Sequence, residues 1–180
     1  MIRVLLISTG GTIEKTYDAR AGVLANAASV LDVMLHSLEL GGIIITRLEL
    51  MNKDSLEMTA VDHEKIAQAA ADGGADHDGI VIVHGTDRLA VTGEAIWKRW
   101  SEPRAPRIPV ILTGAMRPYE MRHTDALQNL TESLLAVQIL KPGVYAVMHN
   151  KVLEFPAVAK DRAHGTFVKC GEAAESRRRS

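Results

Sequence analysis

Two threonines stand directly behind glycines at the ends of apolar runs, and their hydroxyl groups could attack a carbonyl carbon. Thr12 ends the segment TGGT at 9–12, and Thr86 lies in the segment HGTD at 84–87. Glycines after a strand let the backbone turn sharply and expose amide hydrogens that can bind a phosphate, a carboxylate or a developing oxyanion. A threonine hydroxyl becomes a useful nucleophile when a base such as a lysine removes its proton. The two turns together favour acyl chemistry shared by two hydroxyls.

These residues also allow other interpretations. An isolated Gly-Thr pair more often supplies a capping or turn hydroxyl than a nucleophile, and it is the pairing of two turns that favours catalysis. Phosphate binding is less favoured because the dinucleotide spacing and a Gly-Lys-Ser/Thr triplet are missing from the sequence. His84 could bind a metal or transfer protons, but without ligands at metal spacing we expect a structural hydrogen bond. Asp87 could orient the lysine or hold a substrate ammonium.

The composition is that of an ordinary globular protein of one domain. The chain has 180 residues, and its 21 basic and 22 acidic side chains leave a formal net charge of -1, which makes a nucleic acid an unexpected partner. The single Cys170 cannot close an intramolecular disulfide, which predicts a reducing, cytoplasmic location. Apolar runs stay far below the roughly 20 residues that span a bilayer, and the N-terminal run predicts a strand in place of a signal peptide, so no membrane contact is expected.

Strand-like and helix-like segments alternate along the chain. Short apolar runs predict strands at 4–8, 43–45, 80–83, 110–112 and 144–147, and helical periodicity predicts helices at 29–40, 59–73, 89–100 and 124–140. Thr59 and Asp62 have the spacing of a helix-starting capping box. Short loops between these segments predict an α/β fold: a doubly wound, largely parallel sheet with helices on both faces, that is, a Rossmann-like three-layer sandwich. In such sheets ligands bind beyond the carboxyl ends of the strands, where both threonine turns lie.

Three segments resemble the sequence signatures of the bacterial-type L-asparaginase family. They are TGGTI at 9–13, HGTD at 84–87 and GAMRP at 114–118, and the resemblance to the N-terminal domain of the family extends from about Ile2 to Phe167. The resemblance implies hydrolysis of the side-chain amide of L-asparagine, and variably of L-glutamine, to a carboxylate and ammonia. It also implies that the reaction uses no cofactor and no metal ion.

The resemblance also assigns roles to individual residues. Thr12 resembles the usual candidate for the nucleophile that forms the acyl-enzyme, and Thr86 and Asp87 resemble the second threonine and the acidic residue that binds the substrate α-ammonium. Ser55, with Asp54 beside it, resembles the serine that binds the α-carboxylate. The remaining expected substrate-binding positions are backbone ones, at Gly11, Gly85 and Ala115.

A lysine and a tyrosine complete the site that the resemblance implies. Lys160 resembles the lysine of the family's Thr-Lys-Asp relay, reached here through a turn-like segment at 152–154, and Lys151 is a less favoured substitute. Tyr17, in a stretch from Glu14 to Leu24 that is expected to be mobile, resembles the tyrosine that closes over the substrate. An ordinary exposed loop tyrosine is the alternative.

The expected organisation is an asparaginase-like α/β domain over residues 1–168 and a disordered tail over 169–180, with the smaller second domain of the family absent. Such a chain would build its site from the N-terminal domain alone and close the site by dimerisation, which predicts a homodimer or homotetramer. The main alternative is an amino-acid-binding or regulatory module that keeps the pocket without turnover. A nucleotide-binding α/β domain is a weaker alternative that rests on the sheet type alone.

Overall fold

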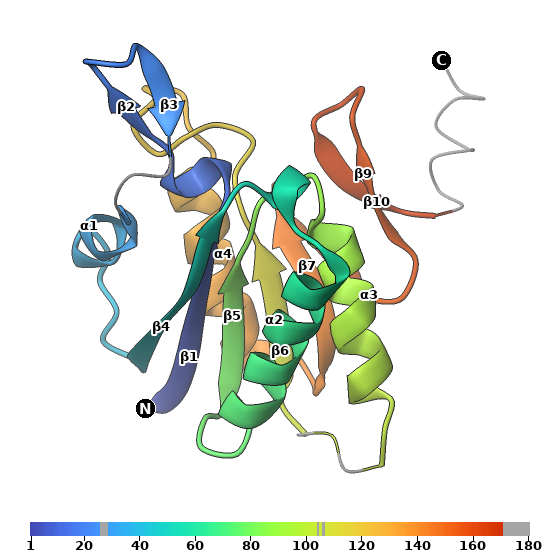
Figure 1. Cartoon of the computed structure of the whole chain (residues 1–180). Helices are drawn as coiled ribbons and strands as arrows, with labels where there is room; N and C mark the ends of the chain where they lie inside the picture. The colour runs from blue at the N-terminus through green and yellow to red at the C-terminus, as the bar shows by residue number, and fades with distance from the viewer. Residues whose placement is uncertain (26–28, 104, 106, 171–180) are drawn as a thin grey trace, which may run out of the picture.

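A six-stranded sheet forms the centre of the molecule (Figure 1). The computed structural model describes residues 1–25, 29–103, 105 and 107–170. The strand order is β4 (Ile43–Lys53), β1 (Ile2–Gly10), β5 (Gly79–Val83), β6 (Pro109–Thr113), β7 (Gly143–Met148) and β8 (Lys151–Glu154). Neighbouring strands are parallel except at the edge, where β8 runs antiparallel to β7. All residues of β5 and β6 are buried, which is why these strands read as unbroken apolar runs.

Helices cover both faces of the sheet, so the predicted doubly wound α/β fold is confirmed. The helices α2 (Ala60–Gly73) and α3 (Leu89–Trp100) lie in front of the sheet in Figure 1, and α4 (Ala126–Ile139) lies behind it. The short helix α1 (Leu31–His36) contributes Leu31 and Met34 to the same core as α4. Two separate apolar cores result, one on each side of the sheet. Among the described residues, no helix is both long and apolar enough to cross a membrane.

The start of α2 has the capping box that the sequence predicts. The Thr59 side chain accepts from the N–H of Asp62, and one oxygen of the Asp62 carboxylate accepts from the Thr59 N–H at 2.8 Å. The other carboxylate oxygen lies 2.8 Å from Lys53 Nζ. Lys53, and next the Thr59 N–H, lower the pKa of Asp62 from 3.8 to about 2. The carboxylate form of Asp62 therefore stabilises the fold.

We expect Asp62→Asn to lower stability at pH 7 and to lower it by a smaller amount at pH 3. A carboxyl group whose pKa is lower in the folded state stabilises above its unfolded value of 3.8, and this stabilisation is lost as the pH falls towards about 2. Urea unfolding midpoints at pH 7 and pH 3 measure the change. Asp76→Asn, at an exposed position beyond the other end of α2, is the matched control. A difference between Asp62→Asn and wild type that is the same at both pH values would contradict the prediction.

Two expectations about local structure are wrong. The predicted helix at 29–40 is shorter, because the Ser37 hydroxyl donates to the Met34 carbonyl at 2.6 Å and the α-helix ends at His36. The segment at 152–154 is part of strand β8 and not a turn. The turn before it uses His149 and Asn150, which have φ of 56° and 59°, and a two-residue turn with two positive φ values joins antiparallel strands.

Two hairpins flank the edge of the sheet where β1 and β5 end (Figure 1). One pairs β2 (Thr16–Asp18) with β3 (Val23–Ala25), and the other pairs β9 (Val158–Asp161) with β10 (Thr166–Lys169). The first hairpin occupies most of the stretch that was expected to be a mobile loop. The disordered tail was expected to begin at 169, which is wrong for its first two residues, because Lys169 ends β10 and the Cys170 N–H donates to the Ala157 carbonyl oxygen at 2.7 Å. Residues 171–180 lie outside the described residues, so the expectation of disorder there remains a prediction.

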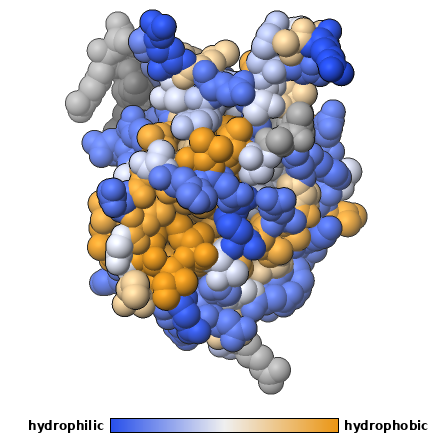
Figure 2. All heavy atoms as spheres, turned by 90° about the vertical axis from the view of Figure 1, so that its left-hand side faces the viewer, coloured by the Kyte–Doolittle hydropathy of each residue, from blue (hydrophilic) through white to orange (hydrophobic). Residues whose placement is uncertain are grey.

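Apolar side chains also gather on the outer surface, over the side of the molecule that carries α1 and β4 (Figure 2). Val33 of α1, and Leu135 and Ile139 of α4, are among the exposed large apolar residues. β4 is an edge strand of the central sheet.

Candidate active site

The two glycine turns contact each other backbone to backbone. They follow the neighbouring parallel strands β1 and β5, in which Ser8 pairs with Val83. Gly11 has a φ of 90°, and a Cβ atom placed on it would lie 2.5 Å from the Cα and the N of Gly85. Only a glycine fits this conformation and this close approach. The fold therefore brings the segments that carry Thr12 and Thr86 to one place at the carboxyl end of the sheet.

Gly11→Ala is expected to destabilise the protein by about 1–3 kcal/mol more than Gly22→Ala does. Both positions have positive φ, at 90° and 68°, and Gly11 also has a ψ of -176°, in a region that essentially only glycine occupies, so its backbone strain adds to the loss. A Cβ on Gly22 meets nothing within 4 Å, whereas a Cβ on Gly11 overlaps the backbone of Gly85, and overpacking of this kind adds about 1–3 kcal/mol. Urea unfolding of both variants measures the difference, and equal losses would show that the contact is unimportant.

Lys160, Thr86 and Asp87 form a contact triad. Lys160 Nζ lies 2.7 Å from Thr86 Oγ1 and 3.1 Å from Asp87 Oδ1. Thr86 is 4 % exposed, and the Lys160 and Asp87 side chains are 17 % and 24 % exposed. Lys160 reaches the two residues from strand β9, more than 70 positions along the chain. The structure thus brings an amine to a buried hydroxyl group and holds it there with a carboxylate.

A second cation contacts the same carboxylate. The Arg162 guanidinium lies 3.0 Å from Asp87 Oδ1, although its side chain is 71 % exposed. Sequence reasoning missed this residue. The signal that could have found it is its spacing, because Arg162 directly follows β9, two positions after Lys160, and side chains two positions apart along an extended chain point to the same side.

Ser55 packs directly against the second glycine turn. It begins the 3-10 turn η2 (Ser55–Glu57), is 2 % exposed, and its Oγ would lie 2.5 Å from a Cβ placed on Gly85. Asp54 accepts from the Leu56 N–H at 3.0 Å and from Lys15 Nζ at 2.7 Å. The Lys15 hydrogen bond, and next that of Leu56, lower the pKa of Asp54. Lys15 is a contact that no local sequence pattern indicated.

Thr12 opens the 3-10 turn η1 (Thr12–Glu14) and is half-buried. Ile13 anchors the turn in the core below it. Glu14, the first residue of the stretch that was expected to be mobile, is 3 % exposed. Burial raises the pKa of Glu14, against the opposing effects of Ser29 and Arg47. The turn that carries Thr12 is therefore held by two buried side chains.

Tyr17 lies in the β2–β3 hairpin and is 60 % exposed. Its backbone N–H donates to Glu120 Oε2 at 2.7 Å, which ties the hairpin to the loop that follows the third motif. The structure therefore leaves the phenol ring at the surface. Its predicted role in closing over a substrate stays a prediction.

The third motif forms a buried turn after β6. Ala115 is 1 % exposed, and the Asp125 carboxylate accepts from the N–H groups of Met116 and Arg117 at 2.9 and 3.0 Å. Burial alone would raise the pKa of Asp125, but the Met116 N–H, and then the hydrogen bond with His149, outweigh it and the pKa is lowered. The turn that contains Ala115 is thus fixed by a charged side chain.

The other two candidates from the sequence, Lys151 and His84, have hydrogen-bond partners outside the side chains of the triad. Lys151 is exposed on β8, and its Nζ lies 3.5 Å from the Phe167 carbonyl oxygen. His84 is fully buried, with its ring nitrogens near Gly85 O and Thr92 Oγ1. Within the described ranges, no cluster of three His, Cys, Asp or Glu side chains could hold a metal ion.

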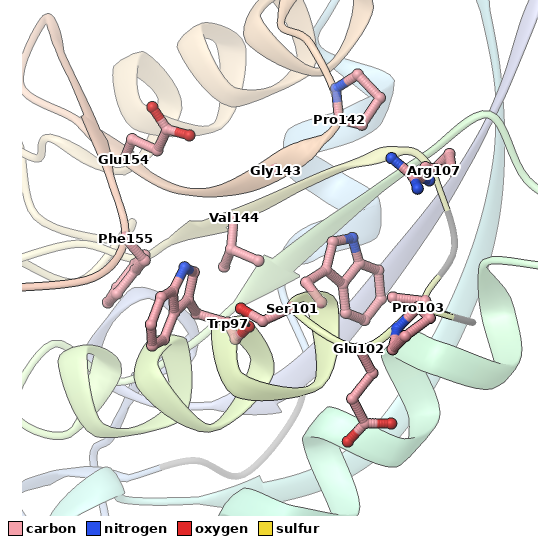
Figure 3. A pocket seen from close by; sticks show the side chains of 12 residues that line it. Trp97, Ser101, Glu102, Pro103, Arg107, Pro142, Gly143, Val144, Glu154 and Phe155 are labelled. Carbon is pink, nitrogen blue, oxygen red and sulfur yellow. Dashed lines mark hydrogen bonds between the residues drawn. The ribbon is translucent and has the colours of Figure 1, made fainter.

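A cavity of about 290 Å³ lies at the opposite edge of the sheet (Figure 3). Trp97, Val144 and Phe155 point into it, and Gly143, the first residue of β7, also lines it. The glycine turns follow the carboxyl ends of the parallel strands, whereas this cavity is at an amino end. The cavity is therefore separate from the residues around Thr86.

Comparison with known proteins identifies the family. The family model described as asparaginase, N-terminal, matches residues 3–168. The chain is 34% identical over 166 residues to an L-asparaginase from Thermococcus kodakarensis, covering 91% of this chain and 49% of that protein. It is 32% identical over 148 residues to a subunit of the glutamyl-tRNA(Gln) amidotransferase from Haloquadratum walsbyi, covering 81% of this chain and 33% of that protein.

A solved structure agrees with these matches. The thermostable L-asparaginase from Thermococcus kodakarensis superimposes with a TM-score of 0.82 at 32% sequence identity, covering 93% of this chain and 51% of that chain. The chain thus spans about half or less of the length of these relatives. The three glycine-containing motifs, the parallel sheet that positions them and the match over residues 3–168 show that this chain belongs to the asparaginase family and corresponds to its N-terminal domain.

Proposed function

We propose that this chain hydrolyses the side-chain amide of L-asparagine, and that of L-glutamine more weakly, to a carboxylate and ammonia. The observation that carries the proposal is the position of Lys160 Nζ, 2.7 Å from Thr86 Oγ1 and 3.1 Å from Asp87 Oδ1. An amine at this distance from a hydroxyl can remove its proton once the amine is neutral. The similarity to an L-asparaginase supports the choice of substrate.

The proposed reaction is an acyl transfer in two steps. A threonine oxygen, of Thr12 or of Thr86, attacks the amide carbon while the hydroxyl proton passes to Lys160. The C–N bond then breaks, the nitrogen takes up the proton and leaves as ammonia, and the acyl group remains on the threonine as an ester. Water attacks the ester, which releases the carboxylate product and restores the hydroxyl. The proposal requires no cofactor and no metal ion.

Substrate binding would use charged groups at both ends of the amino acid. In the proposal Ser55 binds the α-carboxylate and Asp87 the α-ammonium, which holds the amide near the threonines. Asp87 Oδ1 already contacts Lys160 and Arg162, so an incoming ammonium has to share or displace one of these cations. Asp54 supports the turn of Ser55.

The remaining expected contacts belong to the same proposal. Gly11 and Gly85 supply backbone amides, Ala115 lines the floor of the pocket and Tyr17 closes over the substrate. We also propose that residues 1–168 form the catalytic domain and that the chain works in the cytoplasm as a homodimer or homotetramer. A second copy could then cover the site and exclude water.

The direct test is ammonia release from L-asparagine and from L-glutamine by the purified chain, followed in a coupled assay. Faster release from asparagine supports the proposal. Faster release from glutamine supports a second candidate, a glutamine-specific amidase, which the similarity to a glutamyl-tRNA(Gln) amidotransferase favours. Tight aspartate binding in calorimetry without ammonia from either amide would instead identify an amino-acid-binding module.

A further inference from the structure

A chain of three buried side chains lies beneath the turn that carries Thr86. His84 Nε2 lies 2.7 Å from Thr92 Oγ1, and the same hydroxyl oxygen lies 2.7 Å from His63 Nδ1. The three residues come from the end of β5, from α3 and from α2, and they are 0 %, 0 % and 6 % exposed. The two imidazole rings are stacked with their centroids 6.4 Å apart. The mechanism proposed above uses none of these side chains.

The position of the hydrogen atom in each of these hydrogen bonds can be assigned, starting from His84, whose ring contacts Gly85. His84 Nδ1 lies 2.8 Å from the carbonyl oxygen of Gly85, which can only accept, so Nδ1 carries the hydrogen. Burial lowers the pKa of His84 to about 4, so the ring is neutral at pH 7 and its Nε2 is an acceptor. The Thr92 hydroxyl therefore donates to His84 Nε2, and its oxygen accepts from His63 Nδ1–H. In each of these three hydrogen bonds, the hydrogen atom is therefore donated in the direction of Gly85.

The inner end of the chain determines where the Thr86 amide points. The Gly85 carbonyl and the Thr86 N–H belong to one planar peptide unit, and in a trans peptide they point in opposite directions. The cis peptide bond recorded for the described residues lies elsewhere, at Phe155-Pro156. Because His84 holds the Gly85 carbonyl on its own side, the Thr86 N–H is directed away from the imidazole. Gly85 also has little freedom to rotate, since it packs against Ser55.

We propose that His63, Thr92 and His84 are positioning residues that aim the Thr86 amide N–H at the oxygen on which negative charge develops during acyl transfer. The inference rests on the proposed function. A chain of hydrogen bonds that all point the same way polarises its members, and the Gly85–Thr86 peptide at its end becomes a stronger N–H donor. A donor of this kind stabilises the transition state more than the bound substrate. Loss of these hydrogen bonds should therefore lower kcat and leave KM unchanged.

The test compares Thr92→Val with Thr92→Ser. Valine has nearly the same shape as threonine but removes the hydroxyl that joins the two imidazoles, whereas serine keeps it. We expect Thr92→Val to lower kcat for ammonia release from L-asparagine by roughly ten- to a hundredfold. This loss is smaller than the roughly 10²- to 10³-fold loss in kcat expected when an oxyanion donor is removed outright. KM and aspartate affinity should stay within about twofold of wild type, and Thr92→Ser should recover most of kcat. Thr131→Val, at an exposed threonine of α4, is the matched control.

His63→Leu provides a second measurement if Thr92→Val does not fold. It removes only the outer end of the chain, and we expect a smaller fall in kcat with KM unchanged. An unchanged kcat in both variants overturns the inference, as does a rise in KM that matches the fall in kcat, because a general loss of structure would produce that pattern. A wild-type protein that releases no ammonia overturns the proposed function as well, whereas wild-type turnover with an unchanged kcat in both variants overturns the inference alone.

Discussion

Lys160→Met is expected to lower kcat for ammonia release from L-asparagine by about 10²- to 10⁴-fold, the range typical of a general base. Methionine keeps the unbranched apolar stem and removes the amine, which is 2.7 Å from Thr86 Oγ1. Asp87 keeps Arg162 as a partner at 3.0 Å, so the carboxylate is not left without a cation. The loss should therefore appear mainly in kcat. Steady-state rates over a range of asparagine concentrations separate kcat from KM.

Lys151→Met is the matched control for this experiment. Lys151 lies on β8, exposed, with its amine at 3.5 Å from the Phe167 carbonyl oxygen. Its loss should leave the rate within about twofold of wild type, as is usual for exposed substitutions. If Lys151→Met abolishes activity while Lys160→Met does not, the assignment of the base to Lys160 is wrong.

Thr12→Val and Thr86→Val are each expected to lower kcat at least about a hundredfold, which corresponds to about 3 kcal/mol of transition-state stabilisation. Valine keeps the branched shape and removes only the hydroxyl. Thr86 is buried beside Lys160, and Thr12 stands on the turn that contacts Gly85. If the two hydroxyls act on one acyl centre, the double variant should be little slower than either single variant, because groups that act as a unit are not additive.

Thr46→Val, at an exposed position of the edge strand β4, is the control for the two threonine variants. Ammonia release that survives Thr12→Val or Thr86→Val undiminished would remove that threonine from the mechanism. A double variant whose loss is the product of the single losses would show that the two hydroxyls act independently.

Much of the site could be predicted because its residues follow strands. The buried parallel strands of this protein are apolar runs that end at glycines, so the positions of the Thr12 and Thr86 turns could be predicted from the sequence. The capping box at Thr59 was readable for the same reason, since it depends on residues three apart. The end of α1 could not be predicted from the sequence pattern, because the Ser37 side chain competes with the helical hydrogen bonds.

The alternation of strands and helices, the α/β class and the residue types at the ends of the strands all follow from the amino-acid order, because they depend on local periodicity and turn chemistry. Which amine meets Thr86 depends instead on the folded arrangement. The reversal of the chain at His149 and Asn150, and the β9–β10 hairpin after it, bring Lys160 and Arg162 to Asp87 and leave Lys151 at the surface. Contacts between residues more than 70 positions apart, such as that of Lys160 with Thr86, depend on how whole elements pack, and local periodicity does not encode them.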